Sequence, residues 1–597
     1  MMEPSPHVDL LTPAAIRDLA RGLDIRPTKT LGQNFVHDAG TVRRIVAAAG
    51  LAPGTHVLEV GPGLGSLTLA LLEADMRVSA VEIDPKLATA LPRTVETRCD
   101  RPENLRVVWA DALTITGAGD LNERAGSAWE PPRALVANLP YNVSVPVLLG
   151  LIEAIPELET ALVMVQREVA ERLCAGPGSR TYGVPSAKLA WYGEARLAGN
   201  IGRSVFWPEP HVDSALVKFQ RRPRYEASER FDTFSLIDQA FAQRRKTLRK
   251  ALADLCGGAD RAAAALESAG IDQRSRGEAL GIDDFVRLAR AARPGRVARA
   301  SAGGKINLLL DVARPDERGY HPLRSLFCGL DLIETVTVTP RLGERVDVTT
   351  RCASKQIGDL AGLSTNDHLA VRAVRAALAR CGRQAGFHLD VDKHVPVAGG
   401  MAGGSADAAA ALRAAREAFD LDLSDDDLHE IARDLGADVA FGLVGGLALG
   451  LGYGDVVTPL GPAPTRTFVL AINERGLSTP EVFAAFDASG AGRAACEDAL
   501  SPRWMQALAD PDPSALGELV SNDLTDAALS LRPDLREIMR AGDDAGAVCT
   551  FVSGSGPTIV ALARDDEHAA ALARALAAAP GVAATVIATG PVVPGED

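Results

Sequence analysis

The stretch from residue 291 to residue 299 constrains the fold of this chain more than any other. The motifs before it indicate one kind of reaction, and the motifs after it indicate another. A helical pattern over residues 283–292 is followed by Pro294-Gly295, and a strand-like run over residues 305–310 comes shortly afterwards. A Pro-Gly pair ends helices and marks turns. The chain has 597 residues, whereas one domain typically has ~100–200. The sequence therefore predicts two tandem units joined in this stretch.

The two halves also differ in charge, which the net charge of −14 conceals. Residues 1–300 hold 38 Lys and Arg against 36 Asp and Glu, whereas residues 301–597 hold 25 against 41. Much of the basic excess lies within residues 218–250, with ten basic and four acidic side chains. A basic stretch suits a polyanion such as nucleic acid, although most charge runs are only solvated faces. A polyanionic partner is thus plausible for the first half alone.

Targeting signals are not expected. The sequence has no uncharged apolar run of the ~20 residues that a membrane-spanning helix needs. Residues 1–26 include four acids and lack a basic segment followed by an apolar one, so neither a signal peptide nor a transit peptide is predicted. The eight cysteines include no Cys-x-x-Cys pair, which favours reduced thiols over zinc or disulfides. We expect a cytoplasmic protein without a membrane partner, and the oligomeric state stays open.

A glycine turn between a strand and a helix is the first motif that carries chemistry. Residues 56–60 are typical of a buried strand, residues 61–65 read Gly-Pro-Gly-Leu-Gly, and a helical pattern covers residues 66–73. Such a turn lets a ligand approach the backbone in doubly wound folds. A dinucleotide site would need glycine where Ser66 stands, which disfavours NAD. The next strand, residues 77–82, ends in Glu82, a carboxylate that can accept hydrogen bonds from ribose hydroxyls.

Two further predicted strands also end in polar residues. Residues 105–109 lead into Asp111, and residues 133–137 lead into Asn138-Leu139-Pro140-Tyr141. The second motif resembles the (Asn/Asp)-Pro-Pro-(Tyr/Phe) signature of S-adenosylmethionine-dependent methyltransferases that act on the amines of bases. The Asn138 amide oxygen and the Leu139 carbonyl would accept the two N6 hydrogens of an adenine, and Tyr141 would stack on the base. The plain alternative is a loop that Asn and Pro merely shape.

With Leu-Gly-Gln-Asn-Phe at residues 31–35, the first half resembles the ribosomal RNA adenine dimethyltransferases over about residues 28–290. Other matching stretches are residues 81–84, 166–169, 175–179, 206–215 and 241–250. The resemblance implies an α/β fold, with a Rossmann-like methyltransferase domain (1–230) and a small helical RNA-binding subdomain (231–293). It also implies S-adenosylmethionine as cofactor and two adjacent adenosines near the 3′ end of small-subunit rRNA as substrate.

The same resemblance implies roles for individual residues. The expected cofactor-binding residues are Asn34, Val36, Gly61, Gly63, Glu82, Asp111 and Asn138. Phe206 and Tyr141 would sandwich the target adenine, and a basic helix around residues 244–250, with Arg244, Arg245 and Lys246, would grip RNA phosphates. Methyl transfer from a sulfonium needs proximity and a dry pocket more than acid–base catalysis. A large-subunit rRNA methyltransferase and a ribosome-assembly factor that acts by binding remain as alternatives.

A second glycine-rich stretch dominates the other half. Residues 396–407 read Pro-Val-Ala-Gly-Gly-Met-Ala-Gly-Gly-Ser-Ala-Asp and run into an alanine-rich helical pattern that ends at Phe419. Convergent backbone N–H groups and a helix N-terminus favour anion binding. The stretch lacks Gly-Lys-(Ser/Thr), so it is not a Walker loop. A flexible linker is the plain alternative.

Three motifs in a fixed order resemble the GHMP kinases, which phosphorylate galactose, homoserine, mevalonate and phosphomevalonate. They are residues 303–308 (Gly-Gly-Lys-Ile-Asn-Leu), the loop just described, and residues 552–558 (Val-Ser-Gly-Ser-Gly-Pro-Thr). Gly319-Tyr320-His321 and residues 435–439 narrow the resemblance to 4-diphosphocytidyl-2-C-methyl-D-erythritol kinases, over about residues 300–590. The resemblance implies an α+β fold of two lobes, with a linker (294–299), an ATP-binding N-terminal lobe (300–450) and a C-terminal lobe (451–597).

The implied reaction transfers the ATP γ-phosphoryl group, with Mg²⁺, to the 2-hydroxyl of the methylerythritol unit in the non-mevalonate isoprenoid pathway. Asp438 would take the hydroxyl proton, and Lys305 would stabilise negative charge during transfer. Tyr320, His321 and Phe483 would hold the cytosine. ATP would be bound by Pro396, Gly399, Gly400, Gly403, Gly404 and Ser405.

Two departures from the kinase pattern bear on activity. Gly303-Gly304 stands where Pro-Ala is usual, and Met401-Ala402 stands where Leu-Gly is frequent. The added bulk in the loop is expected to weaken ATP binding. A GHMP kinase for another alcohol and an inactive phosphate-binding module remain as alternatives.

Overall fold

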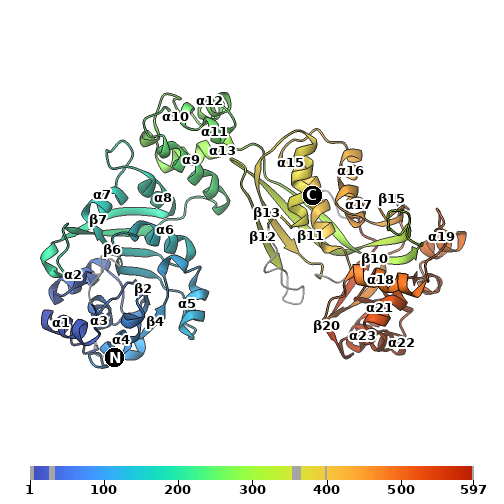
Figure 1. Cartoon of the computed structure of the whole chain (residues 1–597), viewed down its shortest axis with the longest axis horizontal. Helices are drawn as coiled ribbons and strands as arrows, with labels where there is room; N and C mark the ends of the chain where they lie inside the picture. The colour runs from blue at the N-terminus through green and yellow to red at the C-terminus, as the bar shows by residue number, and fades with distance from the viewer. Residues whose placement is uncertain (1–5, 26–33, 353–364, 397–399, 594–597) are drawn as a thin grey trace. The chain divides into compact units, whose positions relative to one another are not determined.

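The chain forms two compact units, which are described separately below. The structure, a computed structural model, describes residues 6–25, 34–352, 365–396 and 400–593. Unit 1 spans Met1–Ala292 and unit 2 spans Arg293–Asp597 (Figure 1). All eight cysteines are free thiols, as the sequence predicts. In the described ranges, no helix combines the length and the apolar character needed to cross a membrane.

Unit 1 is built on a seven-stranded sheet in the order β4-β3-β2-β5-β6-β9-β7. Its strands are β2 (His56–Val60), β3 (Arg77–Glu82), β4 (Leu105–Trp109), β5 (Ala134–Asn138), β6 (Thr160–Gln166), β7 (Gly193–Ile201) and β9 (Ser214–Arg221). The five strands from β4 to β6 run parallel, and β9 is antiparallel to β6 and β7. The predicted doubly wound, Rossmann-like sheet is therefore confirmed.

Helices cover both faces of this sheet, which explains why its central strands are apolar at successive positions. Val57 packs into one core cluster and the next residue, Leu58, packs into the other. The first cluster includes residues of α1 (Pro13–Gly22), α2 (Ala39–Ala49), α3 (Ser66–Glu73) and α4 (Pro85–Glu96). The second includes residues of α5 (Ala118–Ala125), α6 (Ser144–Ala154), α7 (Arg167–Leu173) and α8 (Val184–Tyr192). A short sheet, β1 (Phe35–Val36) with β8 (Phe206–Trp207), joins two distant segments beside it.

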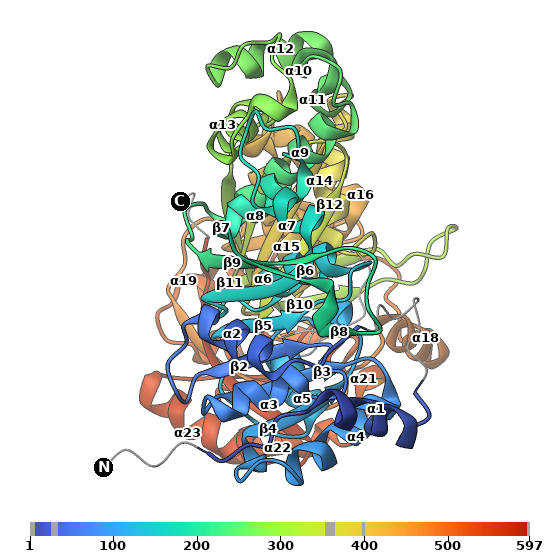
Figure 2. The same cartoon turned by 90° about the vertical axis from the view of Figure 1, so that its left-hand side faces the viewer.

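A group of helices follows the sheet in unit 1 and gathers beyond its β7 edge (Figure 2). They are α9 (Arg230–Ala242), α10 (Leu248–Ala251), α11 (Ala253–Cys256), α12 (Ala259–Ser268) and α13 (Ile282–Ala292). The predicted basic helix around residues 244–250 is only partly present: residues 243–247 form the turn between α9 and α10, whereas Arg249 and Lys250 lie in α10. Arg244, Arg245 and Lys246 therefore lie in the turn and not on a helix.

The described residues of unit 2 form two sheets. The larger has seven strands in the order β12-β13-β11-β10-β17, with β14 on β11 and β15 on β14. Its strands are β10 (Ala298–Val312), β11 (Leu323–Arg341), β12 (Val346–Cys352), β13 (Gly386–Lys393), β14 (Leu447–Leu451), β15 (Val456–Pro459) and β17 (Ser521–Asn522). The helices α14 (Leu369–Arg380), α15 (Gly403–Ala418), α16 (Asp425–Leu435) and α17 (Ala437–Val444) share its core. Strand β10 already begins at Ala298, inside the segment predicted as a linker.

The smaller sheet of unit 2 has the order β18-β19-β16-β20. Its strands are β16 (Arg466–Asn473), β18 (Cys549–Val552), β19 (Ile559–Leu562) and β20 (Val582–Gly590). The helices between these strands are α18 (Thr479–Ser489), α19 (Pro502–Ala509), α20 (Ser514–Gly517), α21 (Thr525–Leu531), α22 (Leu535–Asp544) and α23 (Asp566–Ala577). The chain passes from β15 of the larger sheet to β16 of the smaller one between Pro459 and Arg466, later than the predicted lobe boundary at residue 450, and returns to the larger sheet for β17. The remaining domain bounds stay predictions.

Candidate active sites

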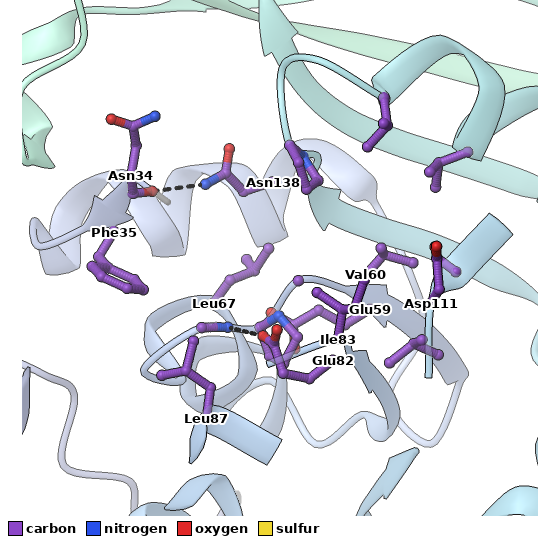
Figure 3. Close-up of a pocket in the computed structure, with 18 of the residues that line it drawn as sticks. Asn34, Phe35, Glu59, Val60, Leu67, Glu82, Ile83, Leu87, Asp111 and Asn138 are labelled. Carbon is purple, nitrogen blue, oxygen red and sulfur yellow. Dashed lines mark hydrogen bonds between the residues drawn. The ribbon is translucent and has the colours of Figure 1, made fainter. Parts of the chain in front are cut away.

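A pocket in unit 1 opens where β2, β3 and β5 end (Figure 3). These strands are parallel neighbours, so their carboxyl ends meet at one edge of the sheet. Every residue that the sequence predicts to bind the cofactor of this unit lines the pocket: Asn34, Val36, Gly61, Gly63, Glu82, Asp111 and Asn138. The structure therefore brings together residues that are more than a hundred positions apart in the chain.

The glycine turn forms one wall of the pocket and is held by Glu82. The backbone N–H of Gly63 donates to Oε2 of Glu82 at 3.1 Å, and the N–H of Asp84 donates to Oε1 at 3.0 Å. Gly63 has φ +58°, and a Cβ there would lie 2.8 Å from the Phe35 ring. Burial raises the pKa of Glu82, whereas the two N–H donors oppose that rise. The carboxylate thus fixes the turn and still faces the pocket.

Asn138 presents an unused hydrogen-bond acceptor. Its Nδ2 donates to the backbone oxygen of Asn34 at 3.1 Å. Because that carbonyl oxygen can only accept, the amide nitrogen must face it, and Oδ1 must point the other way. Oδ1 is buried and has no hydrogen-bond partner among the described residues. An unsatisfied buried acceptor beside a pocket is suited to an N–H donor on a ligand.

The two predicted adenine-stacking residues differ in their surroundings. Tyr141 follows Asn138 in the loop after β5, and its hydroxyl lies 2.7 Å from Oγ of Ser214. Burial raises the pKa of the Tyr141 phenol. Phe206 pairs with Val36 in the short sheet and is only 3% exposed, within the core. Its role in stacking stays a prediction, and it requires the covering side chains to move.

Sequence reasoning missed Glu59, which also lines the pocket. It lies in β2, is 1% exposed, and accepts a hydrogen bond from Thr68 Oγ1 at 2.7 Å. Burial raises the pKa of Glu59 to about 8, so this carboxyl carries a proton at neutral pH. The signal that could have revealed it is a lone acid inside an otherwise apolar strand.

The predicted RNA-binding side chains lie on the turn between α9 and α10. Arg244 is exposed but pairs with Glu278 at 2.9 Å and donates to the Arg180 oxygen at 3.0 Å. Arg245 and Lys246 are also exposed. Arg244 is therefore less available to RNA phosphates than the other two side chains, because its charge is already compensated by Glu278.

In unit 2, the three glycine-containing motifs meet. The backbone N–H of Lys305, in β10, donates to the oxygen of Met401 in the loop before α15 at 3.1 Å. Gly400 approaches the turn between β18 and β19 so closely that a Cβ would lie 2.8 Å from the Ser553 oxygen. Of the predicted ATP-binding residues, Pro396, Gly400, Gly403, Gly404 and Ser405 belong to or border this loop, and Gly399 lies outside the described residues.

Lys305 and Asp438 face each other at this place. Lys305 Nζ lies 3.6 Å from Asp438 Oδ1 and donates to Asn307 Oδ1 at 2.8 Å. The Lys305 side chain is 6% exposed, whereas that of Asp438, in the first turn of α17, is 38% exposed. Asn307, which the sequence did not single out, is held in turn by Ser325 Oγ at 2.7 Å. A buried ammonium with a fixed partner thus stands beside an accessible carboxylate.

The two departures from the kinase pattern differ in their effect on the backbone: Gly304 fits its surroundings, whereas Ala402 is strained. A Cβ on Gly304 would lie 2.9 Å from Cγ2 of Val395, so the alanine usual in this motif would need the valine to shift. Ala402 adopts φ +59°, immediately before α15. L-residues pay for this left-handed conformation, whereas glycine adopts it freely. The loop is therefore strained where the kinase pattern has glycine.

Replacing Ala402 with Gly should stabilise unit 2 by about 0.5–1 kcal/mol, because relief of the left-handed strain exceeds the entropy cost of glycine. Ala376→Gly, at an ordinary position of α14, makes the same chemical change and should cost about 1 kcal/mol. Hydrogen exchange of α15 peptides at increasing urea measures both effects in the full chain. Equal destabilisation by the two variants would contradict the strain at Ala402.

The predicted cytosine-holding residues lie in two neighbouring segments. His321 Nδ1 donates to the Ala313 oxygen at 2.8 Å, and its Nε2 lies 3.3 Å from Oδ1 of Asp487 in α18. The Phe483 ring packs against the imidazole, with ring centroids 5.1 Å apart. Tyr320 is 65% exposed. Both ring nitrogens of His321 thus face protein atoms, and Asp487 is a neighbour that the sequence did not reveal.

The pocket and the motifs define two classes of enzyme: a Rossmann-like methyltransferase in unit 1 and a two-lobed phosphoryl-transfer enzyme in unit 2. Residues 26–293 match the family described as ribosomal RNA adenine dimethylase. Residues 368–448 match the GHMP kinases N terminal domain, and residues 504–582 match the GHMP kinases C terminal domain. The chain belongs to the ribosomal RNA adenine dimethylase family through unit 1, and unit 2 is a GHMP-family kinase.

Two named proteins are similar to the first half of the chain, and a solved structure is similar to the second half. Ribosomal RNA small subunit methyltransferase A of Thermobifida fusca (strain YX) is 61% identical over 48% of this chain and 97% of that protein. The protein of the same name from Kineococcus radiotolerans is 58% identical over 49% of this chain and 96% of that protein. A crystal structure of 4-(cytidine 5'-diphospho)-2C-methyl-D-erythritol kinase is 28% identical, covers 49% of this chain and 100% of its own, and has a TM-score of 0.40. S-adenosylmethionine use by unit 1 and ATP use by unit 2 follow from the families.

Proposed function

We propose that unit 1 dimethylates N6 of two adjacent adenosines near the 3′ end of small-subunit rRNA. The family and the names of the relatives support the reaction and the choice of subunit. The observation that carries the chemistry is the unpaired Oδ1 of Asn138 at the edge of the cofactor pocket. An adenine amine that donates to this oxygen has its nitrogen lone pair drawn out of the ring and toward the methyl donor.

The other residues of unit 1 then act by binding and orientation. Glu82 accepts hydrogen bonds from the cofactor ribose, and Asp111 lines the same pocket. Tyr141 and Phe206 stack on the flipped adenine, while Arg244, Arg245 and Lys246 contact RNA phosphates. Proximity and alignment then supply most of the rate.

Labelled S-adenosylmethionine and ribosomal subunits that lack the modification test this proposal. Methyl transfer to small-subunit particles, at two neighbouring adenosines, is the expected result. Transfer to large-subunit rRNA would support the alternative family. A variant that binds small-subunit particles normally, cannot methylate, and still restores ribosome assembly would indicate that binding is the main function.

We propose that unit 2 phosphorylates the 2-hydroxyl of 4-diphosphocytidyl-2-C-methyl-D-erythritol with ATP and Mg²⁺. The Lys305–Asp438 pair beside the glycine loop carries the phosphoryl-transfer part of this proposal. Asp438 takes the hydroxyl proton, and Lys305 stabilises the charge that develops. The loop residues Pro396, Gly399, Gly400, Gly403, Gly404 and Ser405 hold the triphosphate.

The specific alcohol is supported by Gly319-Tyr320-His321 and by the aromatic neighbour Phe483. The proposal is tested by measuring phosphoryl transfer by the full chain from ATP, with Mg²⁺, to this cytidine compound. Homoserine and mevalonate are assayed in parallel as alternative alcohols. Product from another alcohol alone would indicate a different GHMP kinase. ATP binding without any product would indicate an inactive module.

Asp487 should contribute to the choice of base if the substrate carries cytosine. Its side chain is 47% exposed and one oxygen faces His321, so the other oxygen can accept the exocyclic amine of cytosine. Uracil offers a carbonyl there, which a carboxylate repels. Asp487→Asn should lower the affinity for cytidine 5′-diphosphate ~10–100-fold, as expected for loss of a charge-assisted hydrogen bond of ~1.5–3 kcal/mol.

Calorimetric titration of cytidine and uridine 5′-diphosphates into the full chain measures this preference. The matched control is Glu481→Gln, which removes an exposed charge from the first turn of the same helix and should change neither affinity. An unchanged ratio of the two affinities in Asp487→Asn would show that the base is chosen elsewhere.

A further inference from the structure

Four ionisable side chains are buried where the glycine loop leaves β13 and enters α15. The phosphoryl transfer proposed for unit 2 does not use them. They come from four elements or their ends: Glu334 from β11, Lys393 from β13, Asp407 from α15 and His368 from the N-cap of α14. Their exposed fractions are 0%, 3%, 2% and 7%. Removing charges from water costs several kcal/mol for each ion. A buried cluster of this kind therefore contributes little net stability to the fold.

Lys393 is the centre of the cluster. Its Nζ donates to Oδ2 of Asp407 at 2.6 Å and lies 2.9 Å from Oε1 of Glu334. Glu334 also accepts the backbone N–H groups of His394 at 2.9 Å and Val395 at 3.2 Å. The carboxylate therefore holds the chain where it leaves β13 and enters the loop.

The same contacts join the two ends of the loop. Lys393 ends the strand before it, and Asp407 belongs to the helix that begins after it, at Gly403. The ends lie so close that a Cβ on Gly403 would come within 3.2 Å of Glu334 Oε1 and 3.1 Å of Val395 Cβ. One buried ammonium thus connects the entrance of the loop, its exit and the central sheet.

We infer that Lys393, Glu334 and Asp407 form an ionic clasp that positions the glycine loop for the phosphates of ATP. These three are positioning residues, because they act through the loop backbone. Gly403, Gly404 and Ser405 are held at the start of α15, so their N–H groups are already oriented and less conformational entropy is lost when phosphate binds. The inference rests on the kinase assignment of unit 2 and applies whichever alcohol is phosphorylated.

The charges of the clasp agree with a role beyond stability. Two carboxyl groups face one ammonium, and burial raises the pKa of both, that of Glu334 to about 7. Oδ1 of Asp407 and Nδ1 of His368 are buried without a hydrogen-bond partner among the described residues. A cluster selected for stability alone would pair all of these groups.

Lys393→Met alone would leave two carboxyl groups buried without a countercharge and threatens folding, since breaking a buried pair costs ~3–5 kcal/mol. The test therefore uses Lys393→Met with Asp407→Asn, which removes both charges of the shortest contact. Calorimetric titration of ADP with Mg²⁺ into the full chain should show an affinity lowered ~10–100-fold. This range corresponds to a loss of ~1.4–2.8 kcal/mol of binding free energy when the loop is no longer positioned. Binding of S-adenosylmethionine to unit 1 should be unchanged. Lys393→Arg should retain most of the affinity for ADP.

A second buried ion pair of unit 2 provides the matched control. Arg324 donates to Asp311 at 2.7 Å, and the two residues are 7% and 1% exposed. Arg324→Met with Asp311→Asn makes the same kind of change outside the clasp and should leave the affinity for ADP unchanged while lowering stability. Wild-type affinity in the Lys393–Asp407 variant, or an equal loss in the control, would overturn the inference. The outcome is independent of the alcohol substrate, because no phosphoryl transfer is measured.

Discussion

Asp438→Asn will reduce phosphoryl transfer by unit 2 ~10²–10⁴-fold, the contribution expected of a general base. The amide has almost the same shape as the carboxylate but cannot take the proton of the attacking hydroxyl. Asp438 is accessible, at 38% exposure, and lies 3.6 Å from the ammonium of Lys305. Because Asp438 lies outside the glycine loop, the affinity for ADP with Mg²⁺ should stay within a few-fold of wild type.

The chain carries its own control for this experiment. Methyl transfer by unit 1 of the same molecules should be unchanged, which shows that equal amounts of active chain are compared, and retained binding of ADP with Mg²⁺ shows that unit 2 is folded. Asp434→Asn, at an exposed position near the end of α16, removes a neighbouring charge and should leave the kinase rate intact. A turnover of Asp438→Asn near that of wild type would mean that the hydroxyl loses its proton to another group.

Asn138→Ala will reduce methyl transfer by unit 1 ~10²–10³-fold, the loss that follows removal of one preorganised hydrogen-bonding group in an active site. The substitution deletes the unpaired Oδ1 and also the hydrogen bond from Nδ2 to Asn34. Single-turnover transfer from labelled S-adenosylmethionine to small-subunit particles measures the chemical step separately from cofactor binding.

Asn142→Ala is the matched control, because Asn142 also lines the pocket but is exposed and belongs to the same loop. It should change the single-turnover rate by less than Asn138→Ala does. Kinase activity of unit 2 should be unaffected in both variants. Equal losses would indicate that the loop conformation matters and that the Asn138 oxygen does not.

Much of this architecture could be predicted because it depends on local pattern. Residues 56–60, 66–73, 77–82 and 105–109 form the strands and helix that their periodicity predicts. Parallel neighbours end at one edge, so the polar residues after these strands line one pocket. In unit 2 the order of the three glycine motifs was enough to indicate the family resemblance, and the structure then brings the motifs together.

The sequence by itself determined which segments are strands, helices and glycine turns, because periodicity and turn chemistry are properties of neighbouring residues. Tertiary structure alone decided which distant side chains became partners: Arg244 with Glu278, His321 with Asp487, and Lys393 with Asp407. It also put Ala402 in the left-handed region and turned the basic run before α10 away from helix. Such outcomes depend on strand register and on the packing of elements that are remote in sequence, so no local pattern encodes them.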